Sequence, residues 1–258
     1  MKKKVVISQS TVSAGQLEDF FRMIKDGTIG GEEMKCFLDN PKQFSKSGLT
    51  IVRAINILGQ GKVITSEQAA KAWSMEAPKD VTIRYSETTL RACAEQNQSG
   101  QADWRLVYCH GMSLREQRAK CGVDQNKQPC FYNNDWWLKI SEDKWANFKP
   151  QAGYYLVNFR GQFGNKNWNQ QEQEIAKLGK EYERCHEAIF GEAILTIYMV
   201  NNGERIAEDW YHWGVSLDSD GIRVVIGLFL AFGLLVYDRW RDFSFQDLRV
   251  ALVRKFDH

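Results

Sequence analysis

Residues 209–256 read DWYHWGVSLDSDGIRVVIGLFLAFGLLVYDRWRDFSFQDLRVALVRKF, and this stretch decides the fold. Apolar, β-rich runs alternate in it with Gly, Asp and Ser residues, a pattern typical of strands joined by turns. We expect strands over residues 209–215, 222–229, 234–237 and 248–256. The longest apolar run, residues 224–237, is shorter than the ~20 residues of a membrane helix, and Gly227 and Gly233 divide it. The run therefore predicts strands with a turn and no membrane insertion.

The residues just before this stretch add helices to the predicted sheet. A short aromatic run at 154–159 predicts one strand. Asn169 and Glu172 form a helix-start signal, and apolar residues continue at helical spacing as far as Cys185. A second helix over 188–198 is closed by the Asn-Asn-Gly sequence at 201–203. One strand, two helices and a run of strands predict an α+β fold for residues 153–258.

The first 152 residues divide into two further regions. Residues 1–78 are expected to be mainly helical, with a capping box formed by Thr65 and Gln68. The other candidate helices there are 17–24, 32–38 and 49–58, the last of which could also be a strand. Residues 79–152 predict an α/β connecting region with strands at 81–85, 106–109 and 135–139 and loops at 96–101 and 124–128.

Charge and cysteine content narrow the function classes. The chain has 34 basic and 32 acidic residues and a net charge of +2, which gives no electrostatic reason to expect nucleic acid or an anionic membrane as partner. No apolar signal segment follows the first lysines, so six reduced cysteines in a cytoplasmic chain are the default expectation. Display on a surface or a virus particle would leave the same sequence. Cys109, Cys121 and Cys130 beside His110 lack a paired C-x-x-C, so neither a metal nor a cofactor is predicted.

The motifs of residues 153–258 resemble a known family. They are Tyr211-His212-Trp213-Gly214, Asp218-Ser219-Asp220-Gly221, Arg223-Val224, Gly227-Leu228-Phe229, then Gly233, Val236, Trp240 and Arg254-Lys255-Phe256. This order is similar to the variable proteins of diversity-generating retroelements, which have a C-type-lectin or formylglycine-generating-enzyme-like fold. The resemblance implies a C-type-lectin-like domain that binds a protein or cell-surface ligand through a mutable terminal surface.

In that family, adenine-directed mutagenesis turns AAY codons into NNY codons, which cannot encode Lys, Glu, Gln, Met or Trp. Residues 222–239 contain none of these five types, although a buried hairpin would also lack Lys, Glu and Gln. The resemblance assigns Arg223, Val224, Gly227, Phe229, Gly233, Val236 and Trp240 to the framework, with Trp213 also holding the scaffold. The expected ligand-binding positions are Ile222, Val225, Leu228, Leu230, Phe232, Leu235, Tyr237, Asp238, Arg239, Arg241, Phe243 and Phe245. Such apolar, aromatic and Arg side chains are typical of binding hot spots.

Two other functions stay open beside recognition. A metal-dependent or acid–base enzyme could use His186, Asp209 and His212 with Glu187 and Glu192. No Cys follows Cys185, however, so the chemistry of the formylglycine-generating enzymes is absent, and we predict a protein that is not an enzyme. A single-stranded nucleic-acid binder could use a basic, aromatic patch made of Trp104, Arg105, Arg115, Arg118, Lys120, Trp136, Trp137 and Lys139.

Overall fold

The computed structural model describes residues 49–139 and 144–257, together with isolated positions between Arg22 and Gly31. The chain forms two compact units, Met1–Gly48 and Leu49–His258, and the second is described below. The helices expected at 17–24 and 32–38 fall almost entirely outside the described residues.

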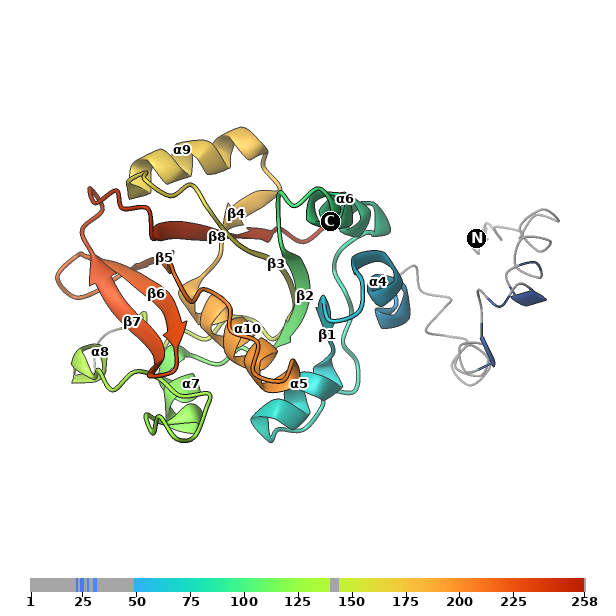
Figure 1. The fold of residues 1–258 in the computed structure, drawn as a ribbon, viewed down its shortest axis with the longest axis horizontal. Coiled ribbons are helices and arrows are strands. Elements are labelled where there is room, and N and C mark those ends of the chain that lie inside the picture. Colours follow the sequence, from blue (N-terminus) through green and yellow to red (C-terminus); the bar gives the residue numbers. More distant parts are fainter. Residues whose placement is uncertain are drawn as a thin grey trace, which may run out of the picture. The chain divides into compact units, whose positions relative to one another are not determined.

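The second unit is α+β, as predicted, with one large mixed sheet (Figure 1). The strands follow the spatial order β1-β2-β3-β8-β5-β6-β7, and β4 pairs with β8 outside this path. Their bounds are β1 Val63–Ile64, β2 Trp104–Cys109, β3 Gly153–Gln162, β4 Tyr182–Arg184, β5 Tyr211–Leu217, β6 Arg223–Leu230, β7 Gly233–Arg239 and β8 Leu248–Arg254. The helices are α4 Ile51–Leu58, α5 Ser66–Trp73, α6 Glu87–Gln98, α7 Leu114–Cys121, α8 Trp136–Lys139, α9 Trp168–Leu178 and α10 Glu187–Val200.

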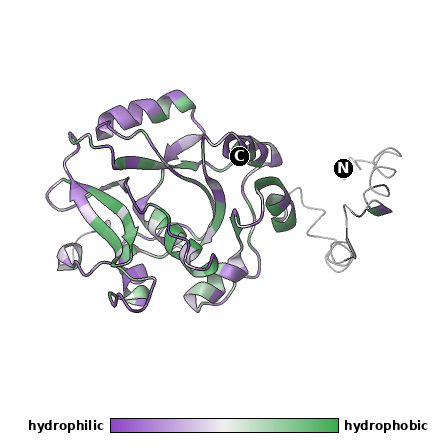
Figure 2. Ribbon diagram, viewed as in Figure 1, coloured by the Kyte–Doolittle hydropathy of each residue, from purple (hydrophilic) through white to green (hydrophobic). Residues whose placement is uncertain are grey.

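Helix α10 forms the centre of the core. Every residue from Glu187 to Ile197 is buried, and Figure 2 shows the helix as mainly hydrophobic. It packs against β2, β5, β6, α5 and α7. The indole of Trp73 donates a hydrogen bond to Thr196 Oγ1 at 2.8 Å, which fixes α5 against this helix. A helix that is apolar on all sides is stable only when protein surrounds it, so α10 organises the sheet around itself.

The sheet continues across residue 152, where a domain boundary was expected. β2 pairs antiparallel with β3 from Trp104 opposite Asn158 to Cys109 opposite Gly153. The terminal segment also returns to the earlier region: Asp257 N donates to Arg84 O at 3.0 Å. Residues 79–152 and 153–258 therefore share one compact unit.

Most predicted elements of the last hundred residues are confirmed, with one error in the helices. α9 begins after Asn167, whose side chain forms a capping box with Gln170, and not at the Asn169 signal. The helix ends at Leu178, because Gly179 has φ +126°, so the expected continuation to Cys185 is wrong. Tyr182 falls at helical spacing by coincidence and begins strand β4, which pairs with β8.

The earlier half contains the other corrections. Of the candidate segment 49–58, residues 51–58 form helix α4, which begins after Thr50, whose side chain accepts a hydrogen bond from Arg53 N; Leu49 forms an isolated bridge with Ile83. The Thr65–Gln68 capping box is confirmed at α5. Residues 81–85 hold only an isolated bridge at Ile83, residues 136–139 form helix α8, and α6 extends to Gln98. The predictions of strands at 81–85 and 135–139 and of a loop from 96 were therefore wrong.

Candidate recognition surface

The two faces of the β5-β6-β7 sheet have different surroundings. On one face Val224, Ile226 and Val236 join the core around α10. On the other face Tyr211, Trp213 and Val225 form a small second core with Leu248, and Trp168 packs over it. Since side chains alternate between the faces of a strand, Tyr237 and Arg239 continue this outer face. The outer face is thus covered at one end and open at the other.

Arginine side chains lie against the aromatic rings of the outer face. The Arg239 guanidinium is 4.4 Å from the ring centroid of Tyr237 and 6.0 Å from that of Tyr211. Arg223 lies 3.9 Å from the Trp168 ring, and burial lowers its pKa. The outer face therefore combines aromatic rings with cationic guanidinium groups.

The loop between β7 and β8, residues 240–247, continues this surface, and we call it the aromatic loop. Its backbone is held at both ends and by Asn165 and Trp168, which lie just before and at the start of α9. The hydrogen bonds are Phe243 N to Trp240 O (3.0 Å), Trp168 N to Arg241 O (3.1 Å), Asn165 N to Phe245 O (3.0 Å), Leu248 N to Phe245 O (3.2 Å) and Tyr211 N to Asp247 O (2.7 Å). A loop with this many backbone bonds has a defined conformation.

The side chains of the aromatic loop nevertheless face solvent. Trp240 is 56% exposed, Phe245 54% and Phe243 39%, and Tyr237 on the adjoining strand is 39% exposed. The rings of Phe243 and Phe245 lie 5.5 Å apart. A fixed backbone that carries exposed aromatic side chains is the arrangement of a preorganised binding surface.

Two of the positions assigned from the sequence were placed wrongly. Val225 was expected to contact ligand, but it is fully buried in the second core. Trp240 was assigned to the framework, but it is the most exposed of the large hydrophobic side chains among the described residues. Trp213, by contrast, is fully buried, as expected of a scaffold residue.

The other expected ligand positions range from half-buried to exposed. Tyr237, Arg241, Phe243 and Phe245 are exposed, whereas Ile222, Leu228, Leu230, Phe232, Leu235, Asp238 and Arg239 are half-buried. Burial and the neighbouring Asp218 carboxylate raise the pKa of Asp238. Two glycines of the framework have clear roles: a Cβ on Gly227 would lie 2.3 Å from Trp210 O, and one on Gly233 2.6 Å from Phe131 C.

Most of the residues expected for acid–base or metal chemistry form hydrogen bonds with the backbone of the folded unit. The fully buried His212 ring accepts from Ala251 N at 3.0 Å and bonds Cys185 O at 2.8 Å, and burial lowers its pKa to about 3. His186 Nδ1 accepts from Ala188 N, while Asp209 is exposed on the loop before β5.

The carboxylates of that constellation are likewise bound to the backbone. Glu187 and Glu192 are fully buried and accept hydrogen bonds from Val215 N and Met112 N, at 3.0 and 2.9 Å. Within residues 49–139 and 144–257, no three His, Cys, Asp or Glu side chains gather as a metal site would require.

Several side chains of the basic aromatic patch are buried or form contacts within the protein. Trp104 and Trp137 are buried, and Arg105 forms ion pairs with Asp103 (2.8 Å) and Glu204 (2.6 Å). Arg118 and Arg115 donate to backbone carbonyls, and the Lys139 side chain lies outside the described residues. These rings and guanidinium groups do not present the open stacking surface that single strands require.

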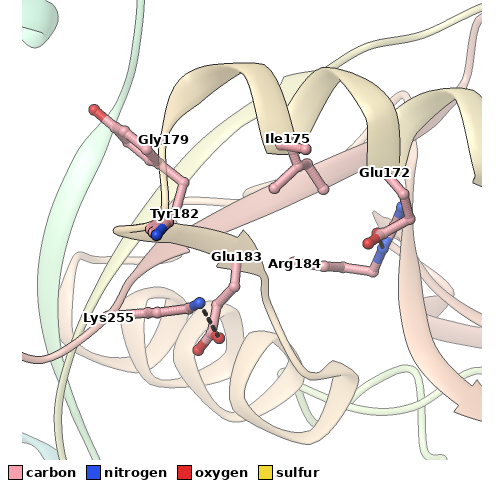
Figure 3. Close-up of a pocket in the computed structure, with 9 residues that line it drawn as sticks. Glu172, Ile175, Gly179, Tyr182, Glu183, Arg184 and Lys255 are labelled. Carbon is pink, nitrogen blue, oxygen red and sulfur yellow. Dashed lines mark hydrogen bonds and ion pairs between the residues drawn. The ribbon is translucent and has the colours of Figure 1, made fainter.

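Two clefts lie elsewhere on the unit. One of about 320 Å³ lies between α9 and β4 (Figure 3). Its lining residues form the ion pairs Glu172–Arg184, at 2.8 Å, and Lys255–Glu183, at 3.9 Å. Another of about 250 Å³ is lined by Arg84, Tyr108 and residues 151–153. Neither cleft includes a residue of the aromatic loop.

No protein-family model, curated protein or solved structure matches the chain. None of the helices among the described residues is long and apolar enough to cross a bilayer.

Proposed function

We propose that this chain is a non-enzymatic recognition protein that binds a protein or cell-surface ligand. Its binding surface comprises the aromatic loop and the adjoining end of β7. The observation that carries this proposal is the contrast within the loop. Its backbone is held by hydrogen bonds, while Trp240, Phe243 and Phe245 remain exposed.

This contrast has a direct energetic consequence for binding. Aromatic side chains bury a large area on contact and have few rotatable bonds, so ordering them costs little entropy. A backbone that is already fixed removes much of the remaining ordering cost. Trp240, Phe243, Phe245 and Arg239 therefore combine the residue types and the rigidity of an interface hot spot.

The strand order supports a C-type-lectin-like fold for residues 153–258 as part of the same proposal. β3 and β8, the first and last strands of this region, pair antiparallel. The elements between these two strands in the sequence are α9, β4, α10 and the β5-β6-β7 meander, so the pairing of β3 with β8 brings the two ends of the region together. In this proposal a retroelement diversifies exposed positions such as Tyr237, Phe243 and Phe245, whereas Trp240 is constant, because NNY codons do not encode Trp.

A binding selection tests the recognition function. Full-length protein is immobilised and a phage-displayed library of short random peptides is panned on it. Enriched peptides are expected to bind the wild-type chain and to lose binding to a Phe243→Ala/Phe245→Ala double variant. Leu178→Ala is the control, because Leu178 is also exposed (42%) but ends helix α9. Equal binding to the double variant and the control contradicts the proposal.

Sequencing the DNA beside the gene tests the diversification. A near-copy of the codons for residues 222–256, differing almost only at adenines and lying beside a reverse transcriptase gene, is the expected result. Finding neither the copy nor the transcriptase leaves a binding protein of fixed specificity.

A further inference from the structure

Strand β7 ends the spatial order of the sheet, and residues 128–136, here called the edge segment, lie along its outer edge. Leu234 N donates to Cys130 O, and Tyr132 N donates to Leu234 O, both at 2.9 Å. Phe131 and Leu234 form a parallel bridge. The edge segment comes from the region before residue 153, a hundred positions away in the chain from β7.

Side chains of the edge segment extend this pairing in both directions. Gln128 Nε2 donates to Ala231 O at 2.8 Å, at the turn between β6 and β7. The indole of Trp136 donates to Val236 O at 3.2 Å, further along the strand. At Gly233 the approach is so close that a Cβ would lie 2.6 Å from Tyr132 N. The two segments are thus held in one register from the turn to the middle of β7.

The edge segment supplies an aromatic neighbour to two of the proposed ligand positions. The Tyr132 ring meets Phe232 edge-to-face at 5.5 Å, and Tyr132 is 39% exposed. The Trp136 ring meets Tyr237 at 6.3 Å and an interplanar angle of 70°. Edge-to-face pairs of this kind restrict the orientation of both rings.

The other side of the edge segment is anchored in the protein. Arg118 Nη1 donates to Tyr132 O at 2.9 Å, and Phe131 is buried against Trp137. Trp136 also contacts the buried Trp145, at 6.1 Å between ring centroids. Tyr132 therefore presents its exposed ring from a backbone that is hydrogen-bonded to β7 on one side and to Arg118 on the other.

We propose that the edge segment is a constant part of the ligand surface: Tyr132 contacts the ligand, Trp136 positions Tyr237, and the ligand is a polypeptide. This inference rests on the proposed recognition function. The exposed charges of the aromatic loop, such as Arg241 and Asp242, are of both signs. A nucleic acid or an anionic membrane requires an excess of positive charge, whereas protein hot spots combine aromatic rings with Arg.

The test uses the peptides enriched on the full-length chain and measures their Kd for single variants. Tyr132→Ala is expected to weaken binding about tenfold or more, and Tyr132→Phe, which keeps the ring, by less than about threefold. Leu178→Ala is again the control for an exposed side chain elsewhere. Thermal unfolding and near-ultraviolet circular dichroism of each variant confirm that it is folded.

A double-mutant cycle tests the positioning role of Trp136. Trp136→Phe removes the indole donor to Val236 O and is expected to weaken binding in the wild-type chain. In a Tyr237→Ala background the same change is expected to have no further effect, because the ring that Trp136 positions is gone. An equal loss in both backgrounds overturns the positioning role, since a general structural defect would be additive.

The remaining outcomes separate this inference from the function on which it rests. If Tyr132→Ala binds like wild type while Phe243→Ala/Phe245→Ala does not, the edge segment is not part of the surface and the recognition function stands. If no peptide distinguishes wild type from that double variant, both are overturned. Binding of a single-stranded oligonucleotide in preference to every peptide, with loss on Tyr132→Ala, overturns the polypeptide assignment.

Discussion

Replacing Trp213 and Trp240 separately by Ala should have very different effects on folding. Trp213 is fully buried, whereas Trp240 is 56% exposed. A buried indole removes about 150–250 Å² from water, which at about 25 cal/mol per Å² corresponds to about 4–6 kcal/mol. Measured Trp→Ala costs in protein cores are about 3–5 kcal/mol, and we expect this range for Trp213→Ala. Trp240→Ala should change the free energy of unfolding by no more than about 0.5 kcal/mol.

Equilibrium urea unfolding, followed by far-ultraviolet circular dichroism, measures both free energies. For a unit of this size, about 3–5 kcal/mol also corresponds to a fall of about 6–20 °C in Tm. The m-value should be unchanged in both variants, because neither alters the surface that unfolding exposes. If the two substitutions lower stability equally, the division of the outer face into a second core and an open surface is incorrect.

Three further substitutions test other parts of this division. Gln171→Ala should lower the free energy of unfolding by about 1–3 kcal/mol, because the buried Gln171 amide donates to Leu248 O at 2.9 Å. The same change should speed hydrogen exchange in residues 240–247. Gln173→Ala, at an exposed position, is the control. Burial lowers the pKa of His212 to about 3, against an ordinary 6.5, so the unfolded chain binds a proton that the folded chain does not, and stability should fall as pH drops from 6.5 towards 3. In His212→Gln the urea midpoint should fall less steeply over this range. Asp238→Asn should raise the urea midpoint at pH 7 but not at low pH. The raised pKa of Asp238 means that its ionised carboxylate is disfavoured in the folded state. Asp242→Asn, at an exposed position, is the control and should leave the midpoint unchanged.

Local sequence signals were sufficient for the last strands and for several helix starts. The strands predicted from residues 209–256 match β5 to β8, because alternating apolar residues and turn residues act over a few positions. The capping box of Thr65 and Gln68 is equally local and is present at α5. The error at α9 came from a competing local signal, since Gly179 ends the helix before the apolar spacing does.

The candidate surface was predicted only in part. Tyr237, Phe243 and Phe245 are exposed at least in part, as expected. Val225, which was expected to contact ligand, is buried, and Trp240, which was assigned to the framework, is exposed. The alternation of residues along a strand separates the two faces of the strand. It does not show which of these faces another segment of the chain will cover. Here Trp168 covers the outer face beside Val225, whereas Trp240 is 56% exposed.

The sequence by itself determined the order of the strands from β5 to β8, the α+β class and the aromatic content of the terminal segment, because these depend on neighbours within a few residues. The tertiary structure alone decided that residues 79–152 join the same sheet and that Tyr132 and Trp136 stand beside β7. The pairing of Leu234 with Cys130 and Tyr132 joins segments a hundred residues apart, and no local pattern encodes such a contact. Phe131 and Leu234 are both buried in the hydrophobic core that also contains α10, and this core forms only when the whole unit is folded.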